Sequence, residues 1–148
     1  MSDRIEKIIE LKAPVDRVWR ALTDAREFGT WFRVALDTPF VEGERAHGHI
    51  TYEGYEHLRF EVKVVAMERP RRFAFTWHPY AVDPAVDYAS ESPTTVEFLL
   101  EPTQTGTRLT MTERGFERLP ARRRDEAMRM NDSGWSTQVE NIRAHVGG

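Results

Sequence analysis

The sequence contains no cysteine, and this absence removes several chemistries. Disulfides, thiolate zinc centres, iron–sulfur clusters and cysteine nucleophiles all require the thiol group. The chain also lacks an apolar run of about 18 residues, the length that a membrane-spanning helix needs, and its first residues lack the apolar core of a signal peptide. We therefore expect a soluble, cytoplasmic protein with no membrane insertion.

The sequence also has no excess of positive charge. The 148 residues carry 21 Lys and Arg against 24 Asp and Glu, which gives a net charge of −3. A protein that binds nucleic acid in general would be basic overall, so we expect no nucleic-acid partner. Apolar residues make up 40% of the chain and charged residues 30%. This composition is ordinary for a globular domain, and the length favours a single domain over residues 1–148.

Familiar catalytic motifs are absent too. There is no GxSxG elbow, phosphate-binding loop, SxxK pair or HExxH helix. His47 and His49 share one face of an expected strand, but no third ligand follows at a suitable spacing, so we expect no metal and no cofactor. A cofactor-independent enzyme stays open, because it needs only a shaped pocket with one acid or base.

The hydrophobic pattern that is present predicts an α+β arrangement. Alternation predicts a first strand over 4–12, and helical spacing then predicts two short helices, one from Pro14 and one over about 25–31. The remaining expected elements are strands at 32–40, 45–54, 57–69, 72–78, 94–102 and 106–114, a long loop at 79–93, and one amphipathic helix over 121–148.

A curved antiparallel sheet of six to seven strands, wrapped around the last helix, would bury that helix's apolar face. Gly134 lies in the middle of this helix beside Trp135. A glycine there costs stability relative to alanine, which suggests a close approach to another element.

Several segments together resemble the START-like SRPBCC superfamily, in its branch of activator of heat-shock-protein-90 ATPase homologues. They are APVDRVWRALTDAREFGTWF (13–32), TPFVEGERAHGHI (38–50), MERPRRFAFTWH (67–78), TTVEFLLEPTQTGTRLTMTERGF (94–116) and NDSGW (131–135). The resemblance implies a helix-grip fold with a cavity between the sheet and the C-terminal helix. It covers only the C-terminal-domain-like part of the eukaryotic chaperone activators, so we expect no stand-alone chaperone activation.

Strand and helix periodicity, combined with this resemblance, predicts the lining of that cavity. The expected ligand-binding residues are Trp31, Tyr52, Phe60, Trp77, Met111, Glu113, Asn131 and Trp135. Glu113 shares the inward side of its strand with Met111, and a buried carboxyl group is costly unless it is paired or protonated. Glu113, and secondarily His78, are therefore the candidate catalytic residues, although pairing with an arginine at the end of the sheet is the simpler interpretation of Glu113.

Three functions remain open at this point. The first is binding of a small hydrophobic or aromatic ligand, such as a lipid or polyketide. The second is a cofactor-independent enzyme of cyclase, aromatase or hydrolase type that uses Glu113. The third is a co-regulator of a chaperone ATPase or a stress-response protein, and a homodimer is left open as well.

Overall fold

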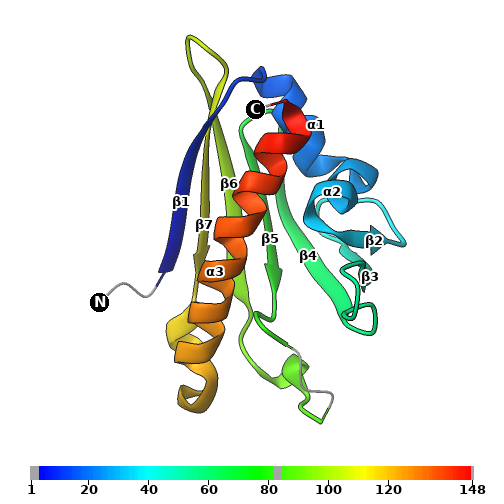
Figure 1. The fold of residues 1–148 in the computed structure, drawn as a ribbon. Helices are drawn as coiled ribbons and strands as arrows, with labels where there is room; N and C mark the ends of the chain where they lie inside the picture. Colours follow the sequence, from blue (N-terminus) through cyan, green and yellow to red (C-terminus); the bar gives the residue numbers. More distant parts are fainter. Residues whose placement is uncertain (1–3, 82–84, 148) are drawn as a thin grey trace.

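The computed structural model describes residues 4–81 and 85–147. A single antiparallel sheet curves around one long helix, α3 (Ala121–Val146), which crosses its concave side (Figure 1). The seven strands lie in the order β1-β7-β6-β5-β4-β3-β2. Their bounds are β1 (Arg4–Leu11), β2 (Val34–Leu36), β3 (Arg45–Ile50), β4 (Arg59–Glu68), β5 (Arg72–Trp77), β6 (Thr94–Pro102) and β7 (Thr107–Arg114). The predicted helix-grip architecture is confirmed.

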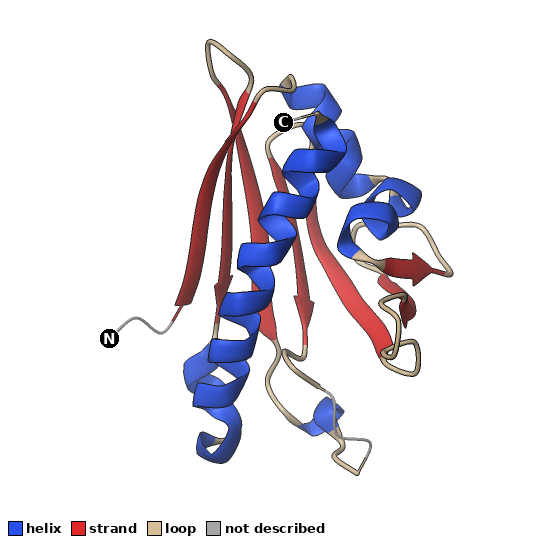
Figure 2. Cartoon of the chain, in the orientation of Figure 1, coloured by secondary structure: helices blue, strands red, loops and turns tan. Residues whose placement is uncertain are grey.

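Two short helices, α1 (Val15–Thr23) and α2 (Ala25–Phe32), follow β1 and pack beside the C-terminal half of α3 (Figure 2). The Asp24 side chain caps α2 by accepting from the backbone N–H groups of Arg26 and Glu27, which satisfies two donors that a helix start leaves free. Arg33 ends α2 in the left-handed region, with a φ of 70°.

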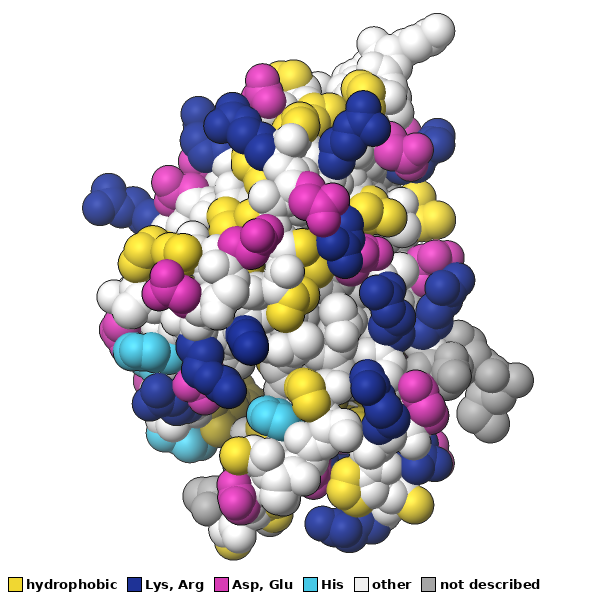
Figure 3. Space-filling model, turned by 180° about the vertical axis from the view of Figure 1, so that it is seen from behind, with side chains coloured by type: hydrophobic (Ala, Val, Ile, Leu, Met, Phe, Trp, Pro, Cys, Tyr) yellow, Lys and Arg dark blue, Asp and Glu magenta, His cyan; other side chains and the backbone are white. Residues whose placement is uncertain are grey.

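Alternation along the strands separates a buried side of the sheet from a charged one. In β4, Phe60, Val62 and Val64 are at most 4% exposed, while the residues between them face outward. The outer side carries mixed charges with single hydrophobic side chains among them (Figure 3). Cross-strand ion pairs such as Arg108–Glu10, at 2.9 Å, lie on it. This pattern is typical of an antiparallel sheet with one side in water.

Three sequence-based expectations differ from the structure. The expected strand 32–40 shortens to β2, because the left-handed Arg33 and Pro39 flank it. The strand expected over 45–54 ends at Ile50, so alternation no longer applies to Tyr52, whose side chain is 39% exposed instead of inward. A Cβ atom added at Gly134 would meet nothing within 4 Å, so the expected close approach there was wrong.

The segment between β5 and β6 contains one short 3-10 helix, η1 (Tyr88–Ser90), and residues 82–84 of the expected loop lie outside the described residues. A second 3-10 helix, η2 (Phe116–Arg118), leads from β7 to α3. Among the residues that the structure describes, no helix is both long and apolar enough to cross a bilayer.

Candidate functional site

Glu113 is the one charged side chain among the buried residues that the structure describes. It lies on β7, two residues after Met111, and strand alternation brings both side chains to the concave side of the sheet. Both are 0% exposed. A buried carboxyl group requires hydrogen-bond partners, because its loss of hydration is otherwise uncompensated.

Four side chains from three elements donate hydrogen bonds to this carboxyl group. Oε2 accepts from Trp77 Nε1 at 2.7 Å on β5 and from Thr94 Oγ1 at 2.6 Å on β6. Oε1 accepts from Trp135 Nε1 at 2.9 Å on α3. The Asn131 amide, one helical turn earlier on α3, lies 3.0 Å from Oε1 and 3.2 Å from Oε2. We call Glu113 and these four donors the Glu113 cluster.

The donor set matches an ionised carboxylate. Two indole N–H groups and an amide NH₂ can only donate, and a carboxylate has about four acceptor positions for them. The contacts of 2.6–2.7 Å are in the range of charge-assisted hydrogen bonds. Within the described residues, no lysine, arginine or histidine forms an ion pair with Glu113. The cluster therefore satisfies the carboxylate's lone pairs but leaves its negative charge without a cationic partner.

Aromatic rings surround the cluster on its inner side. The Trp77 and Trp135 ring centroids lie 5.9 Å apart, and Phe32 lies 6.1 Å from Trp77 and 5.9 Å from Trp135. Phe60 adds a further contact at 6.0 Å to Trp77. Trp77 is only partly buried, whereas the other three rings are at most 6% exposed. Trp77 is thus the ring of this wall that reaches the surface.

The structure brings together most of the predicted lining but not all of it. Phe60, Trp77, Met111, Asn131 and Trp135 lie with Glu113 on the concave side, as expected from their spacing.

Two predicted lining residues lie elsewhere. Trp31 faces α1, where its Nε1 donates to the Ala21 carbonyl at 2.8 Å. Tyr52 lies beyond β3, and its hydroxyl is 3.5 Å from Asn141 Nδ2 on α3.

Sequence reasoning missed Thr94 and Phe32. Thr94 is fully buried at the start of β6, directly opposite Trp77 in the sheet register. A threonine at a strand start gives no sign of such a role, because only the register of β6 against β7, which puts Val96 opposite Glu113, brings it near the carboxyl group. In the sequence, Phe32 is recognisable as an apolar residue at the end of α2. The packing of α2 against α3 decides which rings it contacts.

No residue of the Glu113 cluster lines any of four surface hollows in the described part of the structure, and its two indole rings contact one another. One of these hollows, of about 590 Å³, is lined by residues 85–87, 90–92, 118–120 and 122. In sequence, its lining comes nearest to the cluster at Ser92, two residues before Thr94.

Arg123 fastens the segment between β5 and β6 to the first turn of α3. Its guanidinium lies 2.7 Å from Glu91, donates to the Pro79 carbonyl at 2.8 Å, and lies 4.9 Å from the centroid of the Tyr88 ring. Both partners of the ion pair are nearly buried, with side chains 13% and 5% exposed. One arginine thus ties several points of this segment to the helix that carries Asn131 and Trp135.

His78, the second candidate catalytic residue, follows Trp77 at the end of β5. Burial lowers the pKa of His78 below its usual value, and the nearby Glu91 opposes this effect only in part. Its Nδ1 is buried without a hydrogen-bond partner. The ring is therefore neutral near pH 7, and it does not contribute to the bonding of Glu113.

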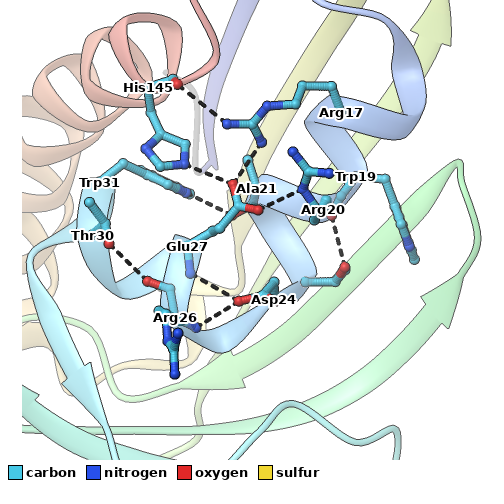
Figure 4. Close-up of polar contacts among 11 residues, drawn as sticks. Arg17, Trp19, Arg20, Ala21, Asp24, Arg26, Glu27, Thr30, Trp31 and His145 are labelled. Carbon is cyan, nitrogen blue, oxygen red and sulfur yellow. Dashed lines mark hydrogen bonds and ion pairs between the residues drawn. The ribbon is translucent and has the colours of Figure 1, made fainter.

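A second polar cluster lies at the opposite end of α3 (Figure 4). Glu27 of α2 accepts from Arg17 at 2.6 Å, from Arg20 at 2.7 Å and from His145 of α3 at 2.9 Å. Burial favours the neutral acid, but the hydrogen bonds from His145, Arg17 and Arg20 outweigh it and lower the pKa of Glu27. These contacts join the last turn of α3 to both short helices.

In the part of the chain that the structure describes, no three His, Asp or Glu side chains lie together in a way that could hold a metal ion. His47 instead contacts Asp37 at 3.1 Å on the outer side of the sheet.

Comparison with known proteins identifies relatives of the whole fold. The family model described as "Activator of Hsp90 ATPase homolog 1-like protein" matches residues 12–147. Protein MLL2253 from Mesorhizobium loti is 25% identical, with a TM-score of 0.75, over 96% of this chain and 95% of that one. A protein from Arthrobacter aurescens, 20% identical over 97% of this chain and 86% of that one, has a TM-score of 0.79 and shows the fold alone.

DynU16, a protein in the dynemicin biosynthetic locus, is 25% identical with a TM-score of 0.73. The alignment covers 98% of this chain but only 47% of DynU16, so this chain spans about half of that protein. A comparison with curated proteins gives no match.

Proposed function

The chain belongs to the family of Activator of Hsp90 ATPase homolog 1-like proteins, whose fold is of a ligand-binding kind, and on this premise we propose that it binds a small apolar or aromatic molecule between the sheet and α3, beside Glu113. The observation that carries the proposal is the Glu113 cluster itself. It places a few directed polar groups within an aromatic wall, which is the usual composition of a small-molecule site.

Trp77 is the residue of the cluster that a ligand contacts first. Its ring is partly exposed, and it contacts Phe60, Phe75 and Trp135 on its buried side. A ligand enters beside Trp77 by parting its ring from those of Phe32 and Phe60, while the Trp77 indole keeps its hydrogen bond to Glu113. Stacking of the ligand on the remaining rings then compensates for the stacking that Trp77 gives up.

The segment fastened by Arg123 forms the adjacent cover. The hollow of about 590 Å³ between this segment and the start of α3 has the size of a small-molecule site. DynU16, which shares the fold, stands in a biosynthetic locus, a setting in which small organic molecules are made or carried. This context supports a small-molecule ligand over a protein partner.

An enzyme that uses Glu113 as general base has less support from the geometry. A general base must accept a proton from its substrate, and the acceptor positions of Glu113 are all occupied by Trp77, Thr94, Asn131 and Trp135. The carboxylate would have to lose one of these donors before it reacted. Binding requires no such step.

The proposal is tested with N-phenyl-1-naphthylamine, a neutral dye whose emission rises in apolar surroundings. The dye is titrated into wild-type protein and into Phe60→Trp and Met111→Trp, which enlarge side chains at the wall. Val65→Trp is the matched control, because Val65 is 42% exposed on the outer side of β4. We expect saturable binding to wild type and control, and weakened binding to both wall variants.

Two results would contradict the proposal. One is the absence of saturable dye binding to the wild type. The other is equal binding by all four proteins, which would place the dye elsewhere. Near-UV circular dichroism of each variant verifies the packing of the core, since a loosened core keeps its far-UV signal and would bind the dye without a site.

A further inference from the structure

We infer that the ligand of this site is an organic cation, namely a quaternary ammonium group attached to an apolar or aromatic body, recognised by the charge of Glu113 and by the faces of the surrounding rings. The inference rests on the proposed function and adds the chemical class of the ligand. It follows from two properties of the Glu113 cluster. The hydrogen bonds to the carboxylate are complete, but its negative charge has no cationic partner.

Hydrogen bonding to Glu113 is complete. Oε2 accepts from Trp77 and Thr94, Oε1 accepts from Trp135, and the Asn131 amide contacts both oxygens. A ligand hydroxyl or primary amine would have to displace one of these donors before it bound. A group that carries charge but needs no acceptor has no such requirement, and a quaternary ammonium is that group.

The negative charge of Glu113 is not compensated by a neighbouring cation. All four donors are neutral side chains, and burial on the concave side keeps water from screening the charge. Arg123, which fastens the cover, pairs with Glu91 at 2.7 Å. His78 is neutral near pH 7, as its buried ring indicates. A ligand cation would supply the missing positive charge.

The aromatic wall has the chemistry that such a cation prefers. The faces of tryptophan and phenylalanine rings attract an ammonium group through the ring quadrupole, and desolvated examples are the strongest. Trp77, Trp135 and Phe32 contact one another around the carboxylate, at centroid distances of 5.9–6.1 Å. When the Trp77 ring parts from Phe32, these faces line a space beside the carboxylate, and the hydrogen bond from Trp77 to Glu113 stays in place.

Two isosteric probes separate charge from shape. N,N,N-trimethyl-2-naphthylammonium and 2-tert-butylnaphthalene have nearly the same size, and they differ in one positive charge. Both are measured by displacement of bound N-phenyl-1-naphthylamine at pH 7. Because desolvated cation–π contacts add about 2 kcal/mol, which corresponds to roughly 30-fold in affinity at 1.4 kcal/mol per tenfold, we expect the cation to bind at least tenfold more tightly.

Variants locate the source of this preference. Glu113→Gln removes the charge and should reduce the preference for the cation severalfold, whereas Glu101→Gln, an exposed change near the end of β6, should leave it intact. Since Glu113→Gln is expected to lose stability, a second pair is measured. Trp77→Phe keeps an aromatic face beside Glu113 and should retain the preference, and Trp77→Leu should reduce it severalfold.

The outcomes for this inference and for the proposed function are distinct. If both probes bind equally, or if the neutral probe binds more tightly, the ligand is not a cation, and Glu113 serves only to hold α3 against the sheet. If neither probe displaces the dye and the dye itself does not bind, the proposed function fails as well. A cation preference that persists unchanged in Trp77→Leu and in folded Glu113→Gln would place the cation at another site and overturn the inference.

Discussion

Replacing Glu113 with glutamine should destabilise the fold strongly, although the two side chains have nearly the same shape. A glutamine has one acceptor oxygen and one donor NH₂ group where the carboxylate has two acceptors. If the NH₂ group takes the place of Oε2, the Thr94 hydroxyl can rotate and accept from it, but the Trp77 indole can only donate and loses its partner. If it takes the place of Oε1, Trp135 loses its partner and Asn131 keeps only its longer contact to Oε2, at 3.2 Å.

The magnitude follows from these partners. A buried donor without an acceptor costs about 1–3 kcal/mol, and hydrogen bonds to a charged acceptor are roughly twice as strong as those to a neutral one. We therefore expect Glu113→Gln to lower the free energy of unfolding by about 2–5 kcal/mol, a large share of the roughly 5–15 kcal/mol of an ordinary domain.

Guanidinium unfolding followed by far-UV circular dichroism measures this loss, with Glu101→Gln as control, expected within about 0.5 kcal/mol of wild type. A loss below about 1 kcal/mol for Glu113→Gln would refute the interpretation that an ionised carboxylate satisfies all four donors. It would mean that water or a proton already serves one of them.

Three further predictions concern the long helix. Trp135→Ala should cost about 3–5 kcal/mol of unfolding free energy, because a ring that is 3% exposed leaves a cavity; a loss below about 1 kcal/mol in the same guanidinium assay would contradict this. Gly134→Ala should stabilise by about 0.5–1 kcal/mol, since the added methyl group meets nothing within 4 Å; a lowered melting temperature would show that helix entropy is not the governing effect there. The lowered pKa of Glu27 gives stability that is complete above its ordinary value of 4.5 and is lost as the pH falls through the lower folded value. Wild type should therefore lose stability below pH 4.5 more steeply than Glu27→Gln, and parallel curves of unfolding free energy against pH would contradict the role of the Glu27 cluster.

Periodicity alone places the central residues of the site. Strand alternation from Met111 to Glu113 and helical spacing from Asn131 to Trp135 both depend on regular elements, and both side-chain pairs lie on the concave side as expected. Regular geometry extends such an inference over many residues, because each position follows from the one before it.

The rest of the site depends on where elements end and on which strands pair. The inward prediction for Tyr52 continues alternation beyond Ile50, the last paired residue of β3, and is therefore wrong. Thr94 gains its role from the register of β6 against β7, which alternation within one strand does not reveal. Trp31 lies on a buried side of α2. Because of the direction in which α2 packs, its indole N–H donates to the Ala21 carbonyl and not to the Glu113 cluster.

The indole N–H resonances of the four tryptophans provide the most direct test of a ligand site at Glu113. In a ¹H–¹⁵N spectrum, Trp77 and Trp135 report on the cluster, whereas Trp31 donates to Ala21 and Trp19 packs against Phe73, away from it. During titration with N,N,N-trimethyl-2-naphthylammonium, we expect the Trp77 and Trp135 signals to shift saturably and those of Trp19 and Trp31 to stay in place. Unmoved signals from Trp77 and Trp135 at saturating probe, or larger shifts at Trp19 and Trp31, would contradict a ligand site beside Glu113.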